Sequence, residues 1–261
     1  SGGQGPRRSR EARRGIRRLR SRPYCVSPWT DDRLRAGPAW VIFRRGEGAP
    51  ATLTLACAAL LISVVLGIPA GIVAAVKRNS VSDAVIRVLA LLGQCMPAFW
   101  LGIMLIMLFA VKLGWMPTGG AEDGLRSLIL PAFTLGVFSA ATICRLLRSN
   151  LIEVLGKEYI DVAKAKGLPK SKIIGKHALK NAMSSIITIL GMQFASLLGG
   201  SVITEQVFAW PGVGRLVIQS ITTSDFAVVE CIVFLMAVIF VVINFIVDVL
   251  YCVINPRVRL Q

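Results

Sequence analysis

Five long stretches without a charged residue constrain this 261-residue chain more than any other feature. They contain 28, 24, 18, 24 and 17 residues, at positions 49–76, 88–111, 127–144, 181–204 and 231–247. About 20 apolar residues in a helix cross the roughly 30 Å hydrocarbon core of a bilayer. The stretches therefore predict an all-α membrane protein, a polytopic helical bundle with about five transmembrane helices near 52–76, 86–111, 127–147, 182–203 and 228–254.

Lysine and arginine are unevenly distributed among the loops between these stretches. Loops 77–87 and 145–180 are rich in basic residues, whereas loops 112–126 and 204–226 hold few. Basic loops stay on the cytoplasmic side of a membrane. We therefore expect 77–87, 145–180 and the C-terminus to be cytoplasmic, and the two other loops to face outward.

The first 50 residues differ in composition from the rest of the chain. They contain thirteen arginines and no lysine, and they cannot span a bilayer because each arginine at a helix centre costs about 3 kcal/mol. The segment 1–49 fits a disordered stretch, an arm for nucleic acid or anionic lipid, or a non-native segment produced by a reading-frame error. We expect it to be separate from a transmembrane domain over 50–261.

Few patterns in this chain suggest chemistry of its own. The phosphate-binding pattern G-x-x-x-x-G-K-[ST] is absent, His177 is the only histidine, and the six cysteines form no C-x-x-C pair. We therefore expect no catalytic residue, no metal site, no bound cofactor and no ATP hydrolysis by this chain. A secondary carrier would be expected to hold more buried acids than Glu230 and Asp248, which lie near the ends of the last span.

Residues 158–182, EYIDVAKAKGLPKSKIIGKHALKNA, form a basic and helix-favouring segment between two apolar stretches. We expect a first helix to end at Gly167, Leu168 and Pro169 to turn the chain, and a second helix to begin with Ser171 as its N-cap. Such a segment can lie on anionic lipid or dock in a groove of a cytoplasmic protein, and these physical arguments favour neither.

The same segment resembles the E-A-A-x-x-x-G signature of permease subunits of binding-protein-dependent ABC importers. Asp161, Ala163 and Gly167 stand at the Glu, second Ala and Gly positions, while Val162 departs from the first Ala. The wider context is similar to the B-type member of the dipeptide, oligopeptide and nickel permease family. The matching stretches are PATLTLA at 50–56, MPAFWLG at 96–102, LGWMP at 113–117, VFAWPGVGRL at 207–216 and NPRVR at 255–259.

This resemblance implies the ABC importer permease fold, in the cytoplasmic (inner) membrane of a bacterium or archaeon. The implied partners are a second homologous permease subunit, two ABC ATPase subunits that bind ATP and magnesium, an extracytoplasmic solute-binding protein and the lipid bilayer, without nucleic acid. Di- and oligopeptides are the expected solutes. Nickel, glutathione and opines are alternatives within the family, and a stand-alone secondary carrier is the alternative outside it.

The resemblance also implies roles for particular residues. A coupling helix at 158–169, within the loop 148–181, would seat in a groove of one ATPase, with Tyr159, Asp161, Ala163, Gly167, Leu168 and Pro169 as the candidate residues. An outer gate or a contact with the binding protein would involve Glu205, Phe208, Trp210, Pro211 and Gly212. Alternatively, the aromatic residues of this loop lie at the membrane interface.

Two further features lie inside the apolar stretches. Gln94 and Pro97 interrupt the second stretch, where a proline kinks a helix; they are expected to line the pathway or to form a packing kink. The sequence GIPAG at 67–71 predicts a kinked, closely packed helix end.

The resemblance also raises an expectation about the start of the chain. Members of the family begin with a cytoplasmic N-terminus and a first spanning helix, which gives them six spans. Five spans with residue 50 outside imply that residues 1–49 stand in place of that first helix.

Overall fold

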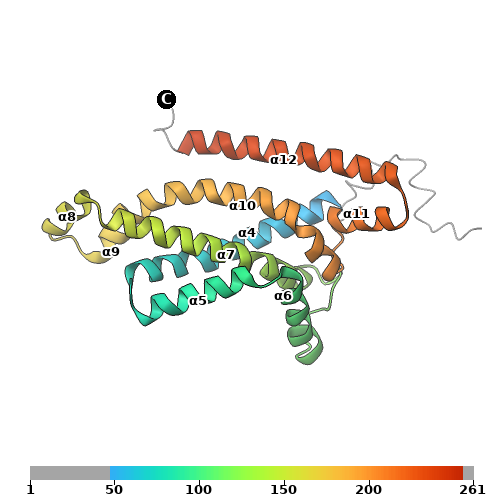
Figure 1. Cartoon of the computed structure of the whole chain (residues 1–261), viewed down its shortest axis with the longest axis horizontal. Coiled ribbons are helices and arrows are strands. Elements are labelled where there is room, and N and C mark those ends of the chain that lie inside the picture. Colours follow the sequence, from blue (N-terminus) through green and yellow to red (C-terminus); the bar gives the residue numbers. More distant parts are fainter. Residues whose placement is uncertain (1–47, 255–261) are drawn as a thin grey trace, which may run out of the picture. The chain divides into compact units, whose positions relative to one another are not determined.

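The computed structural model of the protein describes residues 48–254, which belong to the unit Ile42–Gln261. Figure 1 shows them as a succession of helices. In chain order these are α4 (Ala49–Val76), α5 (Val81–Cys95), α6 (Ala98–Leu105), η1 (Ile106–Lys112), α7 (Leu125–Leu155), α8 (Glu158–Ala165), α9 (Lys170–Lys172), η2 (Ile173–Ala178), α10 (Leu179–Val207), α11 (Val213–Thr222) and α12 (Phe226–Ile254). The expected Arg-rich segment, except its last two residues, and the NPRVR motif at 255–259 lie outside the described residues.

The expected all-α class is confirmed, because residues 48–254 form helices joined by turns and contain no strand. Four segments are long and apolar enough to cross a membrane, namely α4, α7, Ile186–Val207 of α10 and Phe226–Val247 of α12. A bent pair, α5 followed by α6 with η1, brings the number to five if it counts as one span. This agrees with the expected number of about five.

The second expected span, 86–111, is not one continuous helix. The segments Val81–Cys95 and Ala98–Lys112 are bent by 102° relative to each other. Between them, Met96 and Pro97 have an extended backbone, with ψ angles of 132° and 131°. Proline has no N–H to donate and disfavours a helical backbone in the residue before it, so the expected kink becomes a complete break.

The third expected span is longer than predicted, which shortens the loop that follows it. Helix α7 continues to Leu155 instead of ending near residue 147. Its last turns keep Leu151 and Val154 buried, in a core that also contains Ile160 of α8. Because an apolar face continues through these turns, the helix gains burial by continuing. The loop expected from residue 148 therefore begins only after α7 ends.

Helices α4 and α7 pack closely through small residues, as the GIPAG sequence predicts. A Cβ atom at Gly67 would lie 2.8 Å from the carbonyl oxygen of Ala140. A Cβ atom at Gly136 would lie 2.9 Å from the carbonyl oxygen of Ala59. The two backbones thus lie so close that larger side chains would not fit between them. Close backbone contact through small residues is a common basis of helix association in lipid.

The side-chain contacts show how the helices of this unit run relative to one another. Arg148 of α7 pairs with Asp83 near the start of α5. Gln94, near the end of α5, bonds to Thr142, which comes earlier in α7, so the two helices are antiparallel. Helix α10 leaves the α8 region and ends beside α4 and α11 (Figure 1). We call the two ends of the helices the α8 end and the α11 end.

Candidate functional site

The expected coupling segment contains a short helix, α8, that ends in a Schellman motif. Gly167, just after the helix, has a positive φ of 74°. The N–H of Gly167 donates to the carbonyl of Lys164 at 2.9 Å, and the N–H of Leu168 donates to the carbonyl of Ala163 at 3.4 Å. These are the two bonds of that motif, and glycine suits it because it takes a left-handed backbone without steric cost.

One face of helix α8 packs against α7 and α10, and the other face is exposed. Ile160 and Ala163 are buried in a core with residues of α7 and α10. On the other face, Tyr159 is 40% exposed and Val162 is 55% exposed. Among the residues expected to couple to an ATPase, Ala163 thus supports the helix from within. Tyr159, together with the exposed Asp161, Gly167 and Pro169, is accessible, whereas Leu168 is partly buried.

Polar contacts tie α8 to its neighbours. The side-chain amide of Asn181, in α10, donates to the hydroxyl of Tyr159 at 2.9 Å. Asp161 pairs with Lys164 at 2.7 Å, but both side chains are more than half exposed, so this pair adds little stability. The Tyr159 bond joins residues 22 positions apart at the surface, and it therefore links α8 to α10.

The N-cap of the helix after this turn lies two residues earlier than expected. Helix α9 begins at Lys170 and its N-cap is Pro169, with a φ of −64°. The prediction that Ser171 caps this helix is wrong, because Ser171 lies inside the first turn. Pro169 stands at the N-cap instead, with an extended backbone and no side-chain hydrogen bond to the helix.

Glu205, expected at an outer gate, is a fully buried carboxylate at the α11 end, 0% exposed. Its Oε1 accepts hydrogen bonds from the Thr52 hydroxyl at 2.8 Å and the Ser201 hydroxyl at 2.9 Å. Its Oε2 accepts a hydrogen bond from the backbone N–H of Arg215 at 3.2 Å. A buried carboxylate is costly unless such donors satisfy it, and here the donors come from α4, α10 and α11.

The same carboxylate caps helix α11. Gly212 is the N-cap and has no side chain to accept from the first N–H groups. Glu205 accepts from Arg215, and the Thr52 hydroxyl accepts from the N–H of Val213 at 2.9 Å. The positive end of the α11 dipole also favours a negative charge here. Gly212 is required sterically, because a Cβ atom there would overlap the Glu205 carboxylate.

Two other residues expected at the outer gate are enclosed by protein. Phe208 and Trp210 are buried. The indole N–H of Trp210 donates to the carbonyl of Ala51 at 3.0 Å, and the carbonyl of Pro211 accepts from the N–H of Gly48 at 2.8 Å. Two hydrogen bonds therefore join the start of α4 to the turn that precedes α11.

The two candidate pathway residues have different surroundings. Gln94 is half-buried, and its side-chain amide donates to the hydroxyl of Thr142 at 3.3 Å. It lines a cavity of about 250 Å³ between α5 and α7. Pro97 lies in the break that follows α5 and is exposed.

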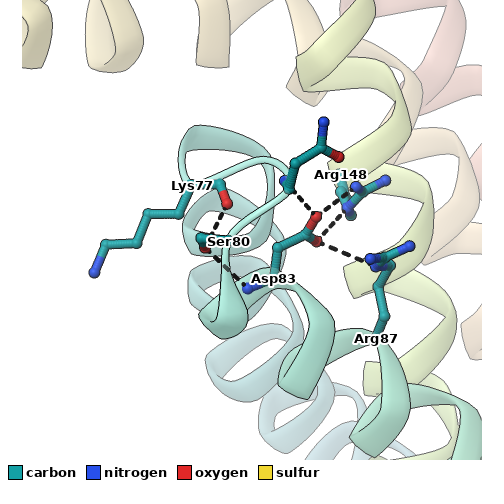
Figure 2. Close-up of polar contacts among 6 residues, drawn as sticks. Lys77, Ser80, Asp83, Arg87 and Arg148 are labelled. Carbon is teal, nitrogen blue, oxygen red and sulfur yellow. Dashed lines mark hydrogen bonds and ion pairs between the residues drawn. The ribbon is translucent and has the colours of Figure 1, made fainter.

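Asp83, which the sequence analysis missed, is the centre of a second buried cluster, shown in Figure 2. It is 0% exposed, and Arg148 donates to both of its oxygens, at 2.7 and 2.8 Å. Arg87 lies 3.5 Å from the same carboxylate, and the backbone N–H of Asn79 donates to it at 3.0 Å. Two parallel bonds from one guanidinium make a strong and directional pair, which ties the turn after α4 to α7.

A local pattern could have indicated part of this cluster. Ser80 and Asp83 have the spacing of an N-terminal capping pair, and the Ser80 hydroxyl accepts from the N–H of Asp83 at 3.3 Å. The pattern predicts a helix start at this point. It does not predict the partner Arg148, which lies 65 residues further along the chain.

Neither buried carboxylate belongs to a candidate metal site. Within residues 48–254, no group of three or more His, Cys, Asp or Glu side chains is placed to hold a metal ion.

Comparison with known proteins identifies relatives of the chain. Residues 67–260 match the family described as "Binding-protein-dependent transport system inner membrane component". The Di/tripeptide transport system permease protein DppB of Pseudomonas aeruginosa is 40% identical, over 81% of this chain and 71% of that protein. The Glutathione transport system permease protein GsiC of Escherichia coli (strain K12) is 43% identical, over 80% of this chain and 68% of that protein.

Solved structures agree on the fold. The MetNI methionine ABC transporter in an inward-facing conformation matches with a TM-score of 0.68 and 20% identity, over 83% of this chain and 97% of that chain. An amino acid ABC transporter with histidines matches with a TM-score of 0.63 and 18% identity, over 78% and 91%. At these identities the likeness shows the fold alone, whereas the family match and the closer relatives confirm the family expected from the motifs. The chain belongs to the binding-protein-dependent transport system inner membrane component family, as a permease subunit of a bacterial ABC importer.

Proposed function

We propose that this permease subunit carries di- and oligopeptides into the cell. The observation that carries the proposal is the 40% identity to a di/tripeptide permease over 81% of this chain. A glutathione permease is 43% identical over 80% of the chain, so glutathione, itself a modified tripeptide, is the nearest alternative. Nickel and opines remain family alternatives that none of these relatives supports.

The family implies that this subunit works with an ATPase and a solute-binding protein. We propose a more specific assembly with a second homologous permease subunit, two ATPase subunits and an extracytoplasmic binding protein. ATP and magnesium would bind in the ATPase subunits, and this chain would hydrolyse no ATP and hold no cofactor. The α8 end and the C-terminus would face the cytoplasm, as the basic loops predict.

Helix α8 is the proposed contact with an ATPase. Its exposed face presents Tyr159 and Val162, and a short helix with apolar residues on its free face suits a groove on a partner protein. Its buried face packs through Ile160 into the core that contains α7 and α10. A displacement of α8 by the ATPase would therefore move the ends of both long helices.

The Glu205 cluster is proposed as part of an outer gate. Its hydrogen bonds join α4, α10 and α11 at one point. If these helices change their relative positions, the hydrogen bonds must break; they persist only if the three helices move together. Since Glu205, Phe208 and Trp210 are buried, a binding protein would touch their exposed neighbours, such as Gln206 and Gln219.

The assembly is tested by affinity purification of the full chain from gently solubilised native membranes, followed by mass spectrometry of the retained proteins. Recovery of a second permease and of ATPases with a phosphate-binding loop is the expected result. Recovery of this chain alone, with its fold preserved by circular dichroism, would contradict the importer assembly and favour a carrier that works alone.

The solute is tested by uptake of a labelled tripeptide into vesicles that contain the purified assembly. Uptake should require ATP, and excess unlabelled dipeptide should compete with it. If glutathione or nickel competes and dipeptides do not, the peptide assignment is wrong. If uptake continues without ATP and follows an ion gradient, the ATP-driven mechanism itself is wrong.

A further inference from the structure

The cavity between α5 and α7 combines concentrated positive charge with apolar walls. Three of its lining residues are Arg87, Arg145 and Arg148. Ala90, Leu91 and Ala141 form much of its apolar surface. At about 250 Å³, it has room for a small charged group but not for a folded partner.

The arginines are only partly neutralised. Asp83 binds Arg148 through both oxygens and lies 3.5 Å from Arg87. Arg145 has no acidic partner within residues 48–254. Three guanidinium groups against one carboxylate leave an excess of two positive charges, and a bound anion would relieve their mutual repulsion.

The charge and the apolar surface lie at different depths. Arg148 lines the α8 end of the cavity and Gln94 lines its inner end, because α5 and α7 are antiparallel. Leu91, on the path between them, is 59% exposed. The neighbouring apolar side chains on α5 that are also exposed are Val88, Leu89 and Leu92. An anionic group at the arginines would therefore have room for an attached hydrocarbon chain along α5.

We propose that this cavity binds the phosphate headgroup of an anionic phospholipid, with its acyl chains along the exposed face of α5. The turn between α4 and α5, which carries Lys77 and Arg78, lies at the same end. Anionic lipids of the cytoplasmic leaflet concentrate at such basic boundaries. The site is independent of the transported solute, and it would hold α5 against α7 beside the Asp83–Arg148 pair.

The test uses the purified full chain in mixed detergent micelles containing phosphatidylglycerol and phosphatidylcholine, with mass spectrometry of the lipid that stays bound. The informative variant is Arg87→Gln with Arg145→Gln. Arg145 is exposed, the Arg87 side chain is 56% exposed, and Arg148 keeps its two hydrogen bonds to Asp83. We therefore expect the variant to fold, and its circular dichroism spectrum checks this. Arg148 is left intact because it holds Asp83. The matched control is Lys77→Gln with Arg78→Gln, which removes the same charge from the same end but outside the cavity.

We expect the wild-type chain to retain phosphatidylglycerol over phosphatidylcholine, and the cavity variant to retain at least about fivefold less of it. The control variant should keep most of the wild-type amount. Equal loss in both variants would show diffuse surface attraction instead of a site, and no loss in the cavity variant would exclude the arginines; either result overturns the proposal.

Two further measurements complete the test. The first distinguishes a lipid headgroup from free phosphate, and the second does not depend on whether a variant folds. Excess inorganic phosphate should not displace the lipid; displacement would mean a site for free anions and would overturn the lipid assignment. In the unmutated chain, phosphatidylglycerol should raise the melting temperature and phosphatidylcholine should not. An equal effect of both lipids would contradict the proposal without the use of any variant.

Discussion

At the scale of single residues, two buried carboxylates join helices that are far apart in the sequence. Glu205 bonds to Thr52, which lies 153 residues earlier, and Asp83 pairs with Arg148. Each carboxylate accepts from donors of more than one element, so removing one donor leaves the buried carboxylate short of a hydrogen bond. Loss of a partner inside protein costs more than a surface bond contributes, and both clusters are therefore sensitive to conservative changes.

The steric demand at Gly212 gives the first prediction. A methyl group in Gly212→Ala would overlap the Glu205 carboxylate, and overpacking of this kind costs about 1–3 kcal/mol. We expect a lower melting temperature in detergent and slower uptake by the reconstituted importer. Gly199→Ala, at an exposed position of α10 where a Cβ atom would meet nothing within 4 Å, is the control and should change neither. A Gly212→Ala protein as stable and active as the unmutated chain would show that the cluster does not constrain α11.

The Asp83 pair gives a second prediction. Asp83→Asn keeps the size of the side chain but leaves Arg148 without its negative partner, and breaking a buried ion pair costs about 3 kcal/mol or more. Thermal unfolding should show this loss. The double change Asp83→Leu with Arg148→Met removes both charges, and it should recover most of the stability because an apolar pair can replace a buried ion pair. A double variant no more stable than Asp83→Asn would contradict the pairing as the source of stability.

At this scale the sequence predicted where residues of interest lie but not their environment. The residues expected at the outer gate were found from their sequence motif. The burial of Glu205 could not be predicted from the neighbouring residues, because its hydrogen-bond donor Thr52 belongs to another helix. Asp83 was missed for the same reason: its Ser80 spacing is local, whereas its strongest partner lies 65 residues away.

At the scale of elements, the contact between α4 and α7 gives a third prediction. The side chain in Gly67→Val would overlap the carbonyl of Ala140. This carbonyl belongs to the backbone of α7, which cannot move without disturbing the helix. We expect a loss of about 2 kcal/mol or more, read as a lower melting temperature of the purified chain. Gly199→Ala, in α10, meets nothing within 4 Å and serves as the control. If both variants melt alike, the close approach of α4 and α7 is not what stabilises this pair.

The element boundaries show what a linear pattern cannot predict. Pro97 indicates an interruption of the span 86–111, but the 102° bend also depends on the residues against which α6 packs. A Cβ atom at Gly102 of α6 would lie 2.9 Å from the ring of Phe208, so α6 is placed by a distant residue. Helix α7 likewise runs past its uncharged stretch, because its face remains buried beyond the first arginines of the expected loop.

Gly167 gives a fourth prediction, on the end of α8. Its φ of 74° is tolerated by asparagine but not by β-branched or bulky residues. Gly167→Asn should therefore preserve co-purification with the ATPases, whereas Gly167→Leu should weaken it while membrane insertion remains intact. Asp161→Ala with Leu168→Ala should weaken it as well. If Gly167→Asn fails as badly as Gly167→Leu, the glycine acts through close approach to the partner instead of through the backbone of the cap.

At the scale of the whole molecule, two independent lines of evidence converge on one topology. The alternation of basic loops predicts that 77–87 and 145–180 share one side of the membrane. The pairing of Asp83 with Arg148 brings those same two loops to the α8 end. The loop 112–126 lies at the opposite end, where the N–H of Gly120 donates to the carbonyl of Phe208 at 2.9 Å.

This topology gives the last prediction, made with single cysteines and a maleimide that cannot cross the membrane. Ser171 and Glu122 are both exposed and lie at opposite ends of the helices. A thiol reacts only where water can ionise it, so Ser171→Cys should label in inside-out vesicles and Glu122→Cys in intact cells. The unmutated chain, with its native cysteines such as the exposed Cys57 and Cys95, sets the background. Labelling of both from the same side would mean that the helices between them do not cross an odd number of times. Labelling with the sides exchanged would place α8 outside the cell, where no ATPase could reach it, and would overturn the coupling role together with the orientation.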